Sequence, residues 1–131
     1  MLADRVIERD TLRADAHGYS FDVRIPWYRS LPLSCLEILD IKVDGIAIPH
    51  ERLDLEIGGE RYGWDQLSPR WDRWWFVTDP CQVHVKGAQL SGPVHAVDVT
   101  LGVRIPYIVE GPPLVVAERC VRTMELKGTG Q

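Results

Sequence analysis

Residues 97–105 read VDVTLGVRI, and this stretch decides the fold class. Apolar side chains occupy every second position, and Asp98, Thr100 and Arg104 lie between them. A period of two puts alternate side chains on opposite faces of a β-strand. The stretch therefore predicts a strand with one buried face and one face in water.

The same alternation recurs along the chain, separated by turn signals. It is found in FDVRI (21–25), LDLEI (53–57) and QVHVK (82–86). The pairs Asp44-Gly45 and Gly58-Gly59 stand between apolar stretches, and such pairs are strong signals for tight β-hairpins. The sequence therefore predicts antiparallel strands joined by short turns.

No segment has the apolar spacing of an amphipathic helix of ten or more residues. GWDQLSPRW (63–71) allows one helical turn before Pro69 ends it. We therefore predict an all-β fold, a single-domain antiparallel β-sandwich of immunoglobulin-like or jelly-roll-like type. The domain spans residues 1–131, and residues 127–131 are expected to be a frayed tail.

The bulk composition is that of a globular protein with one core. The 131 residues are 45% hydrophobic and 26% charged, which argues against disorder. A net charge of -4 argues against a nucleic-acid partner, because such binding rests on phosphate neutralisation by basic residues. We expect no signal peptide and no membrane segment, since no apolar run approaches roughly 20 residues.

Three cysteines, Cys35, Cys81 and Cys120, are widely spaced and odd in number. This pattern fits neither a disulfide framework nor a zinc site. We expect them to be reduced thiols that pack as small hydrophobic side chains in a cytoplasmic protein.

The residues alone predict neither a catalytic group nor a metal site. The histidines show no metal-binding spacing, and His84 falls in the polar set of its strand whereas His95 falls in the apolar set. No nucleophile elbow is present. The carboxylates are scattered singly, without the pairing that glycoside hydrolysis needs.

The segment WDRWWF (71–76) concentrates aromatic side chains beside Arg73. In a strand, one alternating set would face the core, and the other would need a loop or a partner to cover it. Tryptophan and arginine are enriched where interfaces concentrate binding energy. Two interpretations remain open. The segment is either part of the core with its other face covered by a loop, or an interface formed by Trp71, Trp74 and Trp75.

The phrase Val-Arg-Ile-Pro occurs twice, as VRIPWYR (23–29) and VRIPYI (103–108). Proline lacks the N–H that a strand ladder needs, so each strand is expected to end there with an outward arginine and an aromatic residue beyond it. Each phrase is interpreted either as a simple strand terminator or as a binding arm. The candidate substrate-binding or subunit-interface residues are Arg24, Trp27, Tyr28, Arg29, Arg104 and Tyr107.

The stretch VRIPWYRSLPLS resembles the signature RIPxYRxLPLS of the small β subunit of bacterial C-glycoside deglycosidases. The following IKVDGIAIPHERLDLEIGGERYGWDQL resembles the next block of that family, and VHAVDVTLGVRIPYI is similar to its late strand. The resemblance covers roughly Arg24 to Tyr107. The chain departs from the family pattern at Glu60 in GGERY and in the number of tryptophans in WDRWWF.

The resemblance implies a lyase made of two kinds of chain. Its larger α subunit is similar to sugar isomerases, a TIM barrel that holds a divalent metal ion such as manganese and the catalytic base. The substrates it implies are 3-keto C-glycosides of flavonoids or related phenols, cleaved at the C–C bond by proton abstraction and β-elimination. This chain would then contribute no catalytic residue and no metal ligand.

A second hypothesis comes from a different class of protein. Trp71, Trp74 and Trp75 would form a stacking platform in a freestanding carbohydrate-binding module. The first hypothesis predicts a chain that is poorly stable or self-associates without its partner, and the second predicts a monomer that binds sugars. A standalone hydrolase is disfavoured, because the nucleophile and metal motifs are absent from the sequence.

Overall fold

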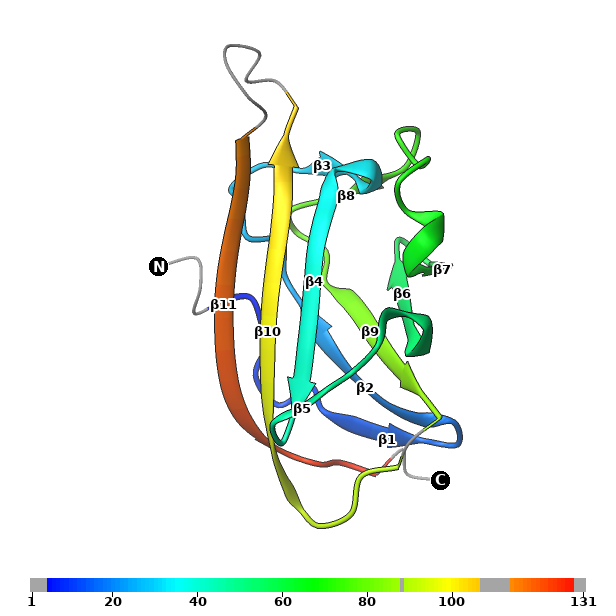
Figure 1. Ribbon diagram of the computed structural model, residues 1–131, viewed down its shortest axis with the longest axis vertical. Helices are drawn as coiled ribbons and strands as arrows, with labels where there is room; N and C mark the ends of the chain where they lie inside the picture. The colour runs from blue at the N-terminus through cyan, green and yellow to red at the C-terminus, as the bar shows by residue number, and fades with distance from the viewer. Residues whose placement is uncertain (1–4, 88, 107–113, 129–131) are drawn as a thin grey trace.

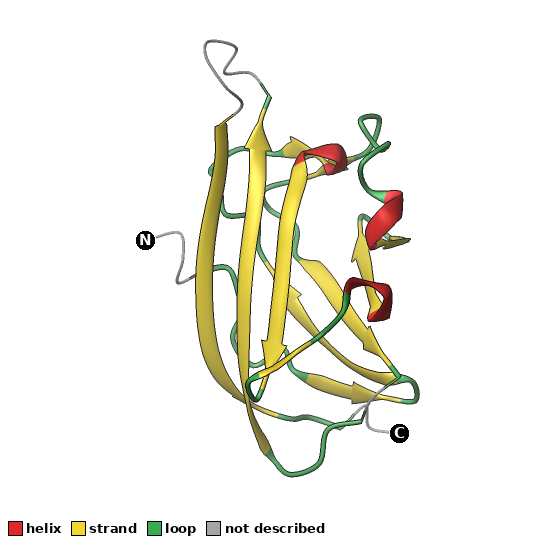
Figure 2. Ribbon diagram, in the orientation of Figure 1, coloured by secondary structure: helices red, strands yellow, loops and turns green. Residues whose placement is uncertain are grey.

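The computed structural model describes residues 5–87, 89–106 and 114–128. In this part of the chain the regular elements are β-strands and short 3-10 turns, and no α-helix is present. The 3-10 turns are the red segments of Figure 2. The strands are β1 (Arg13–Asp15), β2 (Gly18–Val23), β3 (Leu31–Pro32), β4 (Leu36–Val43), β5 (Ile46–Ala47), β6 (Leu53–Ile57), β7 (Glu60–Gly63), β8 (Trp74–Trp75), β9 (Cys81–Lys86), β10 (Val94–Ile105) and β11 (Leu114–Glu125). The 3-10 turns are η2 (Leu33–Cys35), η3 (His50–Arg52) and η4 (Trp64–Gln66).

Two antiparallel sheets pack face to face (Figure 1). One has the strand order β1-β2-β9-β6-β7, and the other has the order β11-β10-β4-β5. The short strands β3 and β8 form a separate pair at one end of the molecule (Figure 1). The predicted all-β, antiparallel sandwich is therefore confirmed.

Both predicted hairpins are present, and the backbone explains why they carry these residues. Asp44 and Gly45, between β4 and β5, have φ angles of 53° and 81°. Gly58 and Gly59, between β6 and β7, have φ angles of 61° and 83°. Positive φ at both central positions suits glycine and aspartate, and such turns match the twist of the flanking strands.

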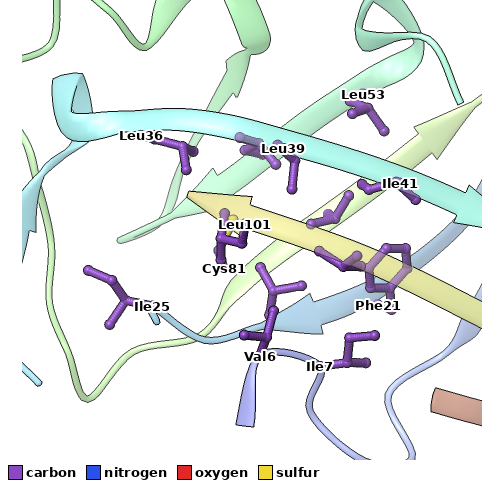
Figure 3. Packing of buried hydrophobic residues seen from close by; sticks show 14 of the residues in the cluster. Val6, Ile7, Phe21, Ile25, Leu36, Leu39, Ile41, Leu53, Cys81 and Leu101 are labelled. Carbon is purple, nitrogen blue, oxygen red and sulfur yellow. The ribbon is translucent and has the colours of Figure 1, made fainter. Parts of the chain in front are cut away.

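The inward faces of the two sheets form one hydrophobic core. The buried face predicted for residues 97–105 is confirmed, because the apolar residues of β10 from Val97 to Ile105 are at most 1% exposed. Opposite them lie the inward residues of β2, β6 and β9. Figure 3 shows Leu39, Ile41 and Leu101 of one sheet beside Phe21, Leu53 and Cys81 of the other. Burial of these side chains is the main favourable contribution to folding.

Strand β2 ends at Val23, two residues before the end that the alternating FDVRI stretch predicts. Val23 pairs with Cys81, the first residue of β9, and Pro80 precedes it. A proline has no N–H to donate to a ladder. The backbone N–H of Arg24 instead donates to the carbonyl of Val6, 2.7 Å away.

The C-terminal side of the chain differs most from expectation. No strand was expected over β11, which pairs with β10 along its whole length. Lys127, expected to begin a frayed tail, is hydrogen bonded instead: its N–H donates to Leu12, and its carbonyl accepts from Ala14. That expectation is therefore wrong at Lys127, and residues 129–131 lie outside the described residues.

Cys35, Cys81 and Cys120 are all buried free thiols, as their interpretation as small hydrophobic residues predicts. Among the described residues, the structure contains no helix long and apolar enough to cross a membrane.

Candidate functional site

The segment after β2 and the tryptophan-rich segment form one structural unit at the end of the sandwich where β3 and β8 lie (Figure 1). Strand β3 pairs with β8, so residues 30–34 run beside residues 70–77. Hydrogen bonds join Leu33 N–H to the Arg73 carbonyl (2.9 Å), Ser34 N–H to the Arg70 carbonyl (3.1 Å) and Val77 N–H to the Ser30 hydroxyl (2.8 Å). The segment that follows VRIPWYR and the WDRWWF segment, which are far apart in the sequence, are therefore neighbours in the structure.

This end carries a group of aromatic side chains that we call the aromatic rim, comprising Trp27, Tyr28, Trp71, Trp74 and Phe76. The side chains of Tyr28 (61% exposed) and Trp71 (75% exposed) project into solvent, and Trp74 and Phe76 are also exposed. Trp27 is half-buried, with its ring 4.6 Å from that of Tyr28. Exposed aromatic side chains make this end of the sandwich a candidate interaction surface.

The WDRWWF segment is not one continuous strand, because only Trp74 and Trp75 have strand geometry. The alternating burial that a strand would give is therefore absent. Only Trp75 enters the core, at 2% exposure, and its Nε1–H donates to the Asp79 carbonyl at 2.9 Å. Trp75 is therefore unavailable to a partner or a sugar, which removes it from both the predicted interface and the predicted stacking platform.

A shallow cleft of about 240 Å³ adjoins the aromatic rim. Glu60 spans it, because its Oε1 accepts from Arg73 Nε at 2.9 Å and from the Tyr62 hydroxyl at 3.1 Å. The Glu60 carboxylate raises the pKa of Arg73, and burial together with the same carboxylate raises the pKa of Tyr62. Glu60, a departure from the family pattern, therefore fixes the guanidinium that stands between Trp71 and Trp74 in sequence.

Arg24 and Arg104 are both bonded within the chain. Arg24 donates through Nε to Glu8 Oε2 and through Nη1 to the Thr78 carbonyl, each at 2.6 Å. Arg104 donates through Nη1 to Glu37 Oε2 at 3.0 Å. The two arginines thus tie the ends of their strands to neighbouring segments.

The remaining candidates of the two VRIP phrases are Arg29, whose position is described, and Tyr107. The Arg29 guanidinium lies over the ring of Tyr28, 5.8 Å from its centroid, so these two side chains form a cation–π pair on the rim. Tyr107 lies outside the described residues.

The described residues contain no cluster of three or more histidine, cysteine, aspartate or glutamate side chains able to hold a metal ion. His84 lies on the outer face with Nε2 3.0 Å from Glu56, and His95 is buried beside Asp44, as their opposite parities predict. Burial raises the pKa of the Cys81 thiol and raises the pKa of Tyr19 to about 12. These two groups are therefore held neutral in the core and are poor nucleophiles.

Two hollows away from the rim were not anticipated. One, of about 370 Å³, lies where the rings of His50 and Trp64 stack with centroids 4.4 Å apart. The other gathers arginines from residues 5–9, the end of β2 and β11. Neither hollow has a local sequence motif. The charged N-terminal stretch DRVIERD (4–10) is the one sequence feature that points to the arginine-lined hollow.

The chain matches the family model described as C-glycoside deglycosidase beta subunit over residues 2–107. A Microbacterium protein named 3'-dehydrocarminate deglycosidase beta subunit is 40% identical over 128 residues, covering 97% of each chain. C-glycoside deglycosidase beta subunits of Microbacterium trichothecenolyticum and Arthrobacter globiformis are 37% and 36% identical, covering 95% and 96% of this chain and 97% and 98% of their own.

The fold and the rim define a small all-β protein with exposed aromatic side chains at one end. The chain belongs to the C-glycoside deglycosidase beta subunit family.

Proposed function

We propose that this chain is the β subunit of a hetero-oligomeric lyase that cleaves the C–C bond of 3-keto C-glycosides. The observation that carries the proposal is the near full-length similarity to proteins named as beta subunits of C-glycoside deglycosidases. One of these is named for 3'-dehydrocarminate, and the prefix 3'-dehydro fits a substrate oxidised at sugar carbon 3. Flavonoid or related phenolic C-glycosides are the proposed substrate class.

The proposed reaction suits a bond that ordinary glycoside hydrolysis cannot break. A C–C glycosidic bond offers no leaving-group oxygen for an acid to protonate. A ketone at sugar carbon 3 acidifies the proton on carbon 2, so a positioned base can remove it. The electron pair then forms the double bond between carbons 1 and 2, and the aglycone leaves carbon 1 and takes up a proton.

We assign the base and a divalent metal ion, such as manganese, to a TIM-barrel α subunit similar to sugar isomerases. The described residues of this chain do not fit a metal, because they contain no cluster of ligating side chains. Such an ion, when bound to the partner, would act as a Lewis acid toward the substrate carbonyl. The part of this chain is then to bind and stabilise the assembly.

The aromatic rim is the surface that we assign to the α subunit. The β3–β8 pair fixes the backbone at Trp74, and the hydrogen bonds of Arg70, Arg73 and Val77 fix the backbone on either side of it, so the segment that carries Trp71, Trp74 and Phe76 is anchored to the sandwich. Aromatic side chains on an anchored backbone are the kind of residue that dominates interface energetics. Reduced, buried cysteines agree with assembly in the cytoplasm, which we propose as the compartment.

Co-expression of the chain with a sugar-isomerase-like barrel encoded beside it tests the proposal. We expect the two chains to co-elute in size-exclusion chromatography. The complex should release aglycone from a 3-keto C-glycoside, measured by liquid chromatography. Co-elution without aglycone release, or release by the barrel at the same rate without this chain, would contradict the proposed function.

Alanine variants locate the interface. Trp71→Ala with Trp74→Ala and Phe76→Ala should weaken association at least about 100-fold, because a single aromatic hot spot contributes about 2 kcal/mol or more. Alanines at Trp27, Tyr28 and Arg29 should likewise weaken association or lower turnover.

The matched control for these variants is Ile46→Ala. Ile46 is 70% exposed on β5, at the end of the sandwich opposite β3 and β8 (Figure 1). The Ile46→Ala variant should bind the barrel with the same affinity as the natural chain. If the two sets of alanine variants bound the barrel as tightly as Ile46→Ala does, the aromatic rim would not be part of the interface.

The freestanding carbohydrate-binding module remains the competing proposal. Its stacking platform loses Trp75 to the core, which leaves Trp71 and Trp74 as the exposed indoles. A monomeric purified chain that binds soluble sugars, with affinity lost in the Trp71→Ala variant, would favour this class of function over the first.

A further inference from the structure

A hollow of about 610 Å³ lies where the N-terminal segment, the end of β2 and β11 meet. Its lining residues are Arg5, Ile7, Glu8, Arg9, Arg24 and Arg122. Among the described residues, this lining brings four arginines and one glutamate together in a chain whose net charge is -4. The hollow shares no lining residue with the aromatic rim, and the proposed function assigns it no ligand.

Backbone hydrogen bonds bring these arginines together from three parts of the chain. Glu8 N–H donates to the Asp22 carbonyl at 2.9 Å, and Arg24 N–H donates to the Val6 carbonyl at 2.7 Å. These bonds hold the N-terminal segment along the end of β2. On the other side, Arg122 Nε donates from β11 to the Ile7 carbonyl at 3.1 Å.

The four arginines differ in how they are bonded. Arg24 is fixed by Glu8 and the Thr78 carbonyl, and Arg122 is fixed through Nε by the Ile7 carbonyl. Arg5 and Arg9 are exposed and form no ion pair within the described part of the chain. Two positioned arginines and two without a described ion pair therefore line one hollow, and Glu8 is the carboxylate among its described lining residues that offsets their mutual repulsion.

We propose that this hollow binds a small multivalent oxyanion, presented as phosphoryl groups or as clustered carboxylates. The guanidinium group matches both, because its N–H fork donates two parallel hydrogen bonds to a pair of oxygens. Several converging cations favour a multivalent anion over a monovalent one. The volume lies within the range of small-molecule sites.

The surroundings favour a compact ligand over an extended acidic polypeptide. The adjoining hollow, of about 230 Å³, shares Arg9 and Arg122 but also contains Asp10. A carboxylate at that position repels an anion that extends beyond the four arginines. Asp10 therefore limits the positive region on the side of this adjoining hollow.

Titration calorimetry tests the proposal on the full-length chain, purified with any subunit that stays bound to it. The probes are pyrophosphate, citrate and, as a monovalent anion, acetate. We expect one saturable site for pyrophosphate or citrate that weakens as salt is added, and no comparable binding of acetate. The stronger of the two multivalent probes identifies the phosphoryl or the carboxylate form of the ligand.

The paired variants are Arg5→Ser with Arg9→Ser, and Arg61→Ser with Arg119→Ser. Each pair lowers the net charge by the same amount, but Arg61 and Arg119 are exposed and lie outside the hollow. The first pair should weaken binding at least about tenfold, and the second less than about twofold. Circular dichroism should show that both pairs fold, because all four side chains are on the surface.

Equal weakening in the two pairs would reduce the effect to general charge attraction and overturn the proposal. It would also fall if a poly-glutamate peptide bound tightly while pyrophosphate and citrate did not, because the hollow would then be a protein-docking surface. If the natural chain binds the oxyanion but does not bind the α subunit in the co-expression test, that result contradicts the proposed function and leaves the oxyanion site in place.

Discussion

The His95 ring connects two turns at one end of the sandwich. It is 5% exposed, with Nδ1 2.6 Å from Asp44 Oδ2 and Nε2 3.0 Å from the Gly92 carbonyl oxygen. Asp44 also accepts the Ala96 N–H at 2.9 Å. These bonds hold the β4–β5 turn against the start of β10, so a single residue pair links local turn geometry to the packing of one sheet.

Asp44→Asn should lower stability near neutral pH by about 1 kcal/mol, a value discounted because the carboxylate is half exposed. Asparagine keeps an amide oxygen and tolerates the φ of 53°, so the turn persists while the charge is lost. The hydrogen bond from His95, followed by that from Ala96, lowers the pKa of Asp44 on folding.

A carboxyl whose pKa is lowered on folding stabilises the folded state above its unfolded pKa, about 4. That stabilisation disappears as the pH falls through the lower folded pKa. Urea unfolding of the natural chain and the variant between pH 7 and pH 3 should therefore give a difference in unfolding free energy that shrinks below about pH 4. A pH-independent difference would show that the charge of Asp44 contributes nothing.

At the scale of elements, β10 is an interior strand of its sheet, and Gly102 marks an irregularity in it. The pairing with β4 shifts register between Gly102 and Val103. A Cβ added at Gly102 would lie 2.9 Å from Ile38 Cδ1 and 3.0 Å from Ile38 Cβ. Ile38 therefore occupies the space that any larger residue at position 102 would need.

Gly102→Ala should destabilise the chain by about 1–3 kcal/mol, the usual cost of inserting a methyl group into a packed site. Ile38→Ala in the same chain should relieve the overlap, so the double variant should be more stable than the sum of the two single changes predicts. Urea unfolding of the four chains measures this coupling. Additive effects would mean that Ile38 does not oppose a side chain at position 102.

The sequence predicted elements where a strand has one wet face and one buried face, as β6, β9 and β10 do. It did not predict β11, because Val115 and Val121 lie on its exposed face and alternation is lost. It also did not predict the pairing of Leu31 with Trp75, since two-residue strands far apart in sequence leave no periodic signal.

The candidate site was predicted in its parts and not in its arrangement. Trp71 and Trp74 were candidates because tryptophan is enriched at interfaces, and both are exposed. Which indole would be buried depended on the β3–β8 pairing, so Trp75 was assigned wrongly to the surface. The arginine hollow depends on contacts between Ile7 and Arg122, residues at opposite ends of the chain.

At the scale of the whole molecule, the two sheets are joined along one side. Lys127, just beyond β11, forms a bridge with Arg13 of β1, and Ile7 forms a bridge with Val23 of β2. The N-terminal segment thus contributes Val6 and Ile7 to the core between both sheets (Figure 3). Because one core is shared and its side is closed by both ends of the chain, we expect the sandwich to unfold as one cooperative unit.

The three buried cysteines test this cooperativity, because they lie in different parts of the fold. Cys35 is in η2, Cys81 is in β9 of one sheet and Cys120 is in β11 of the other. Burial also raises the pKa of the Cys81 thiol, which lowers its thiolate fraction in the folded state. We expect all three to resist N-ethylmaleimide in the native chain and to become reactive at the same urea concentration, measured site by site by peptide mass spectrometry.

An Ala47→Cys variant supplies the matched control, since Ala47 is exposed on the short strand β5 and its thiol should react without urea. Because β11 is an edge strand, its early release is the alternative that the experiment can detect. If Cys120 became reactive at a lower urea concentration than Cys81, β11 would open as a separate unit, and the bridge at Lys127 would not hold the two sheets together.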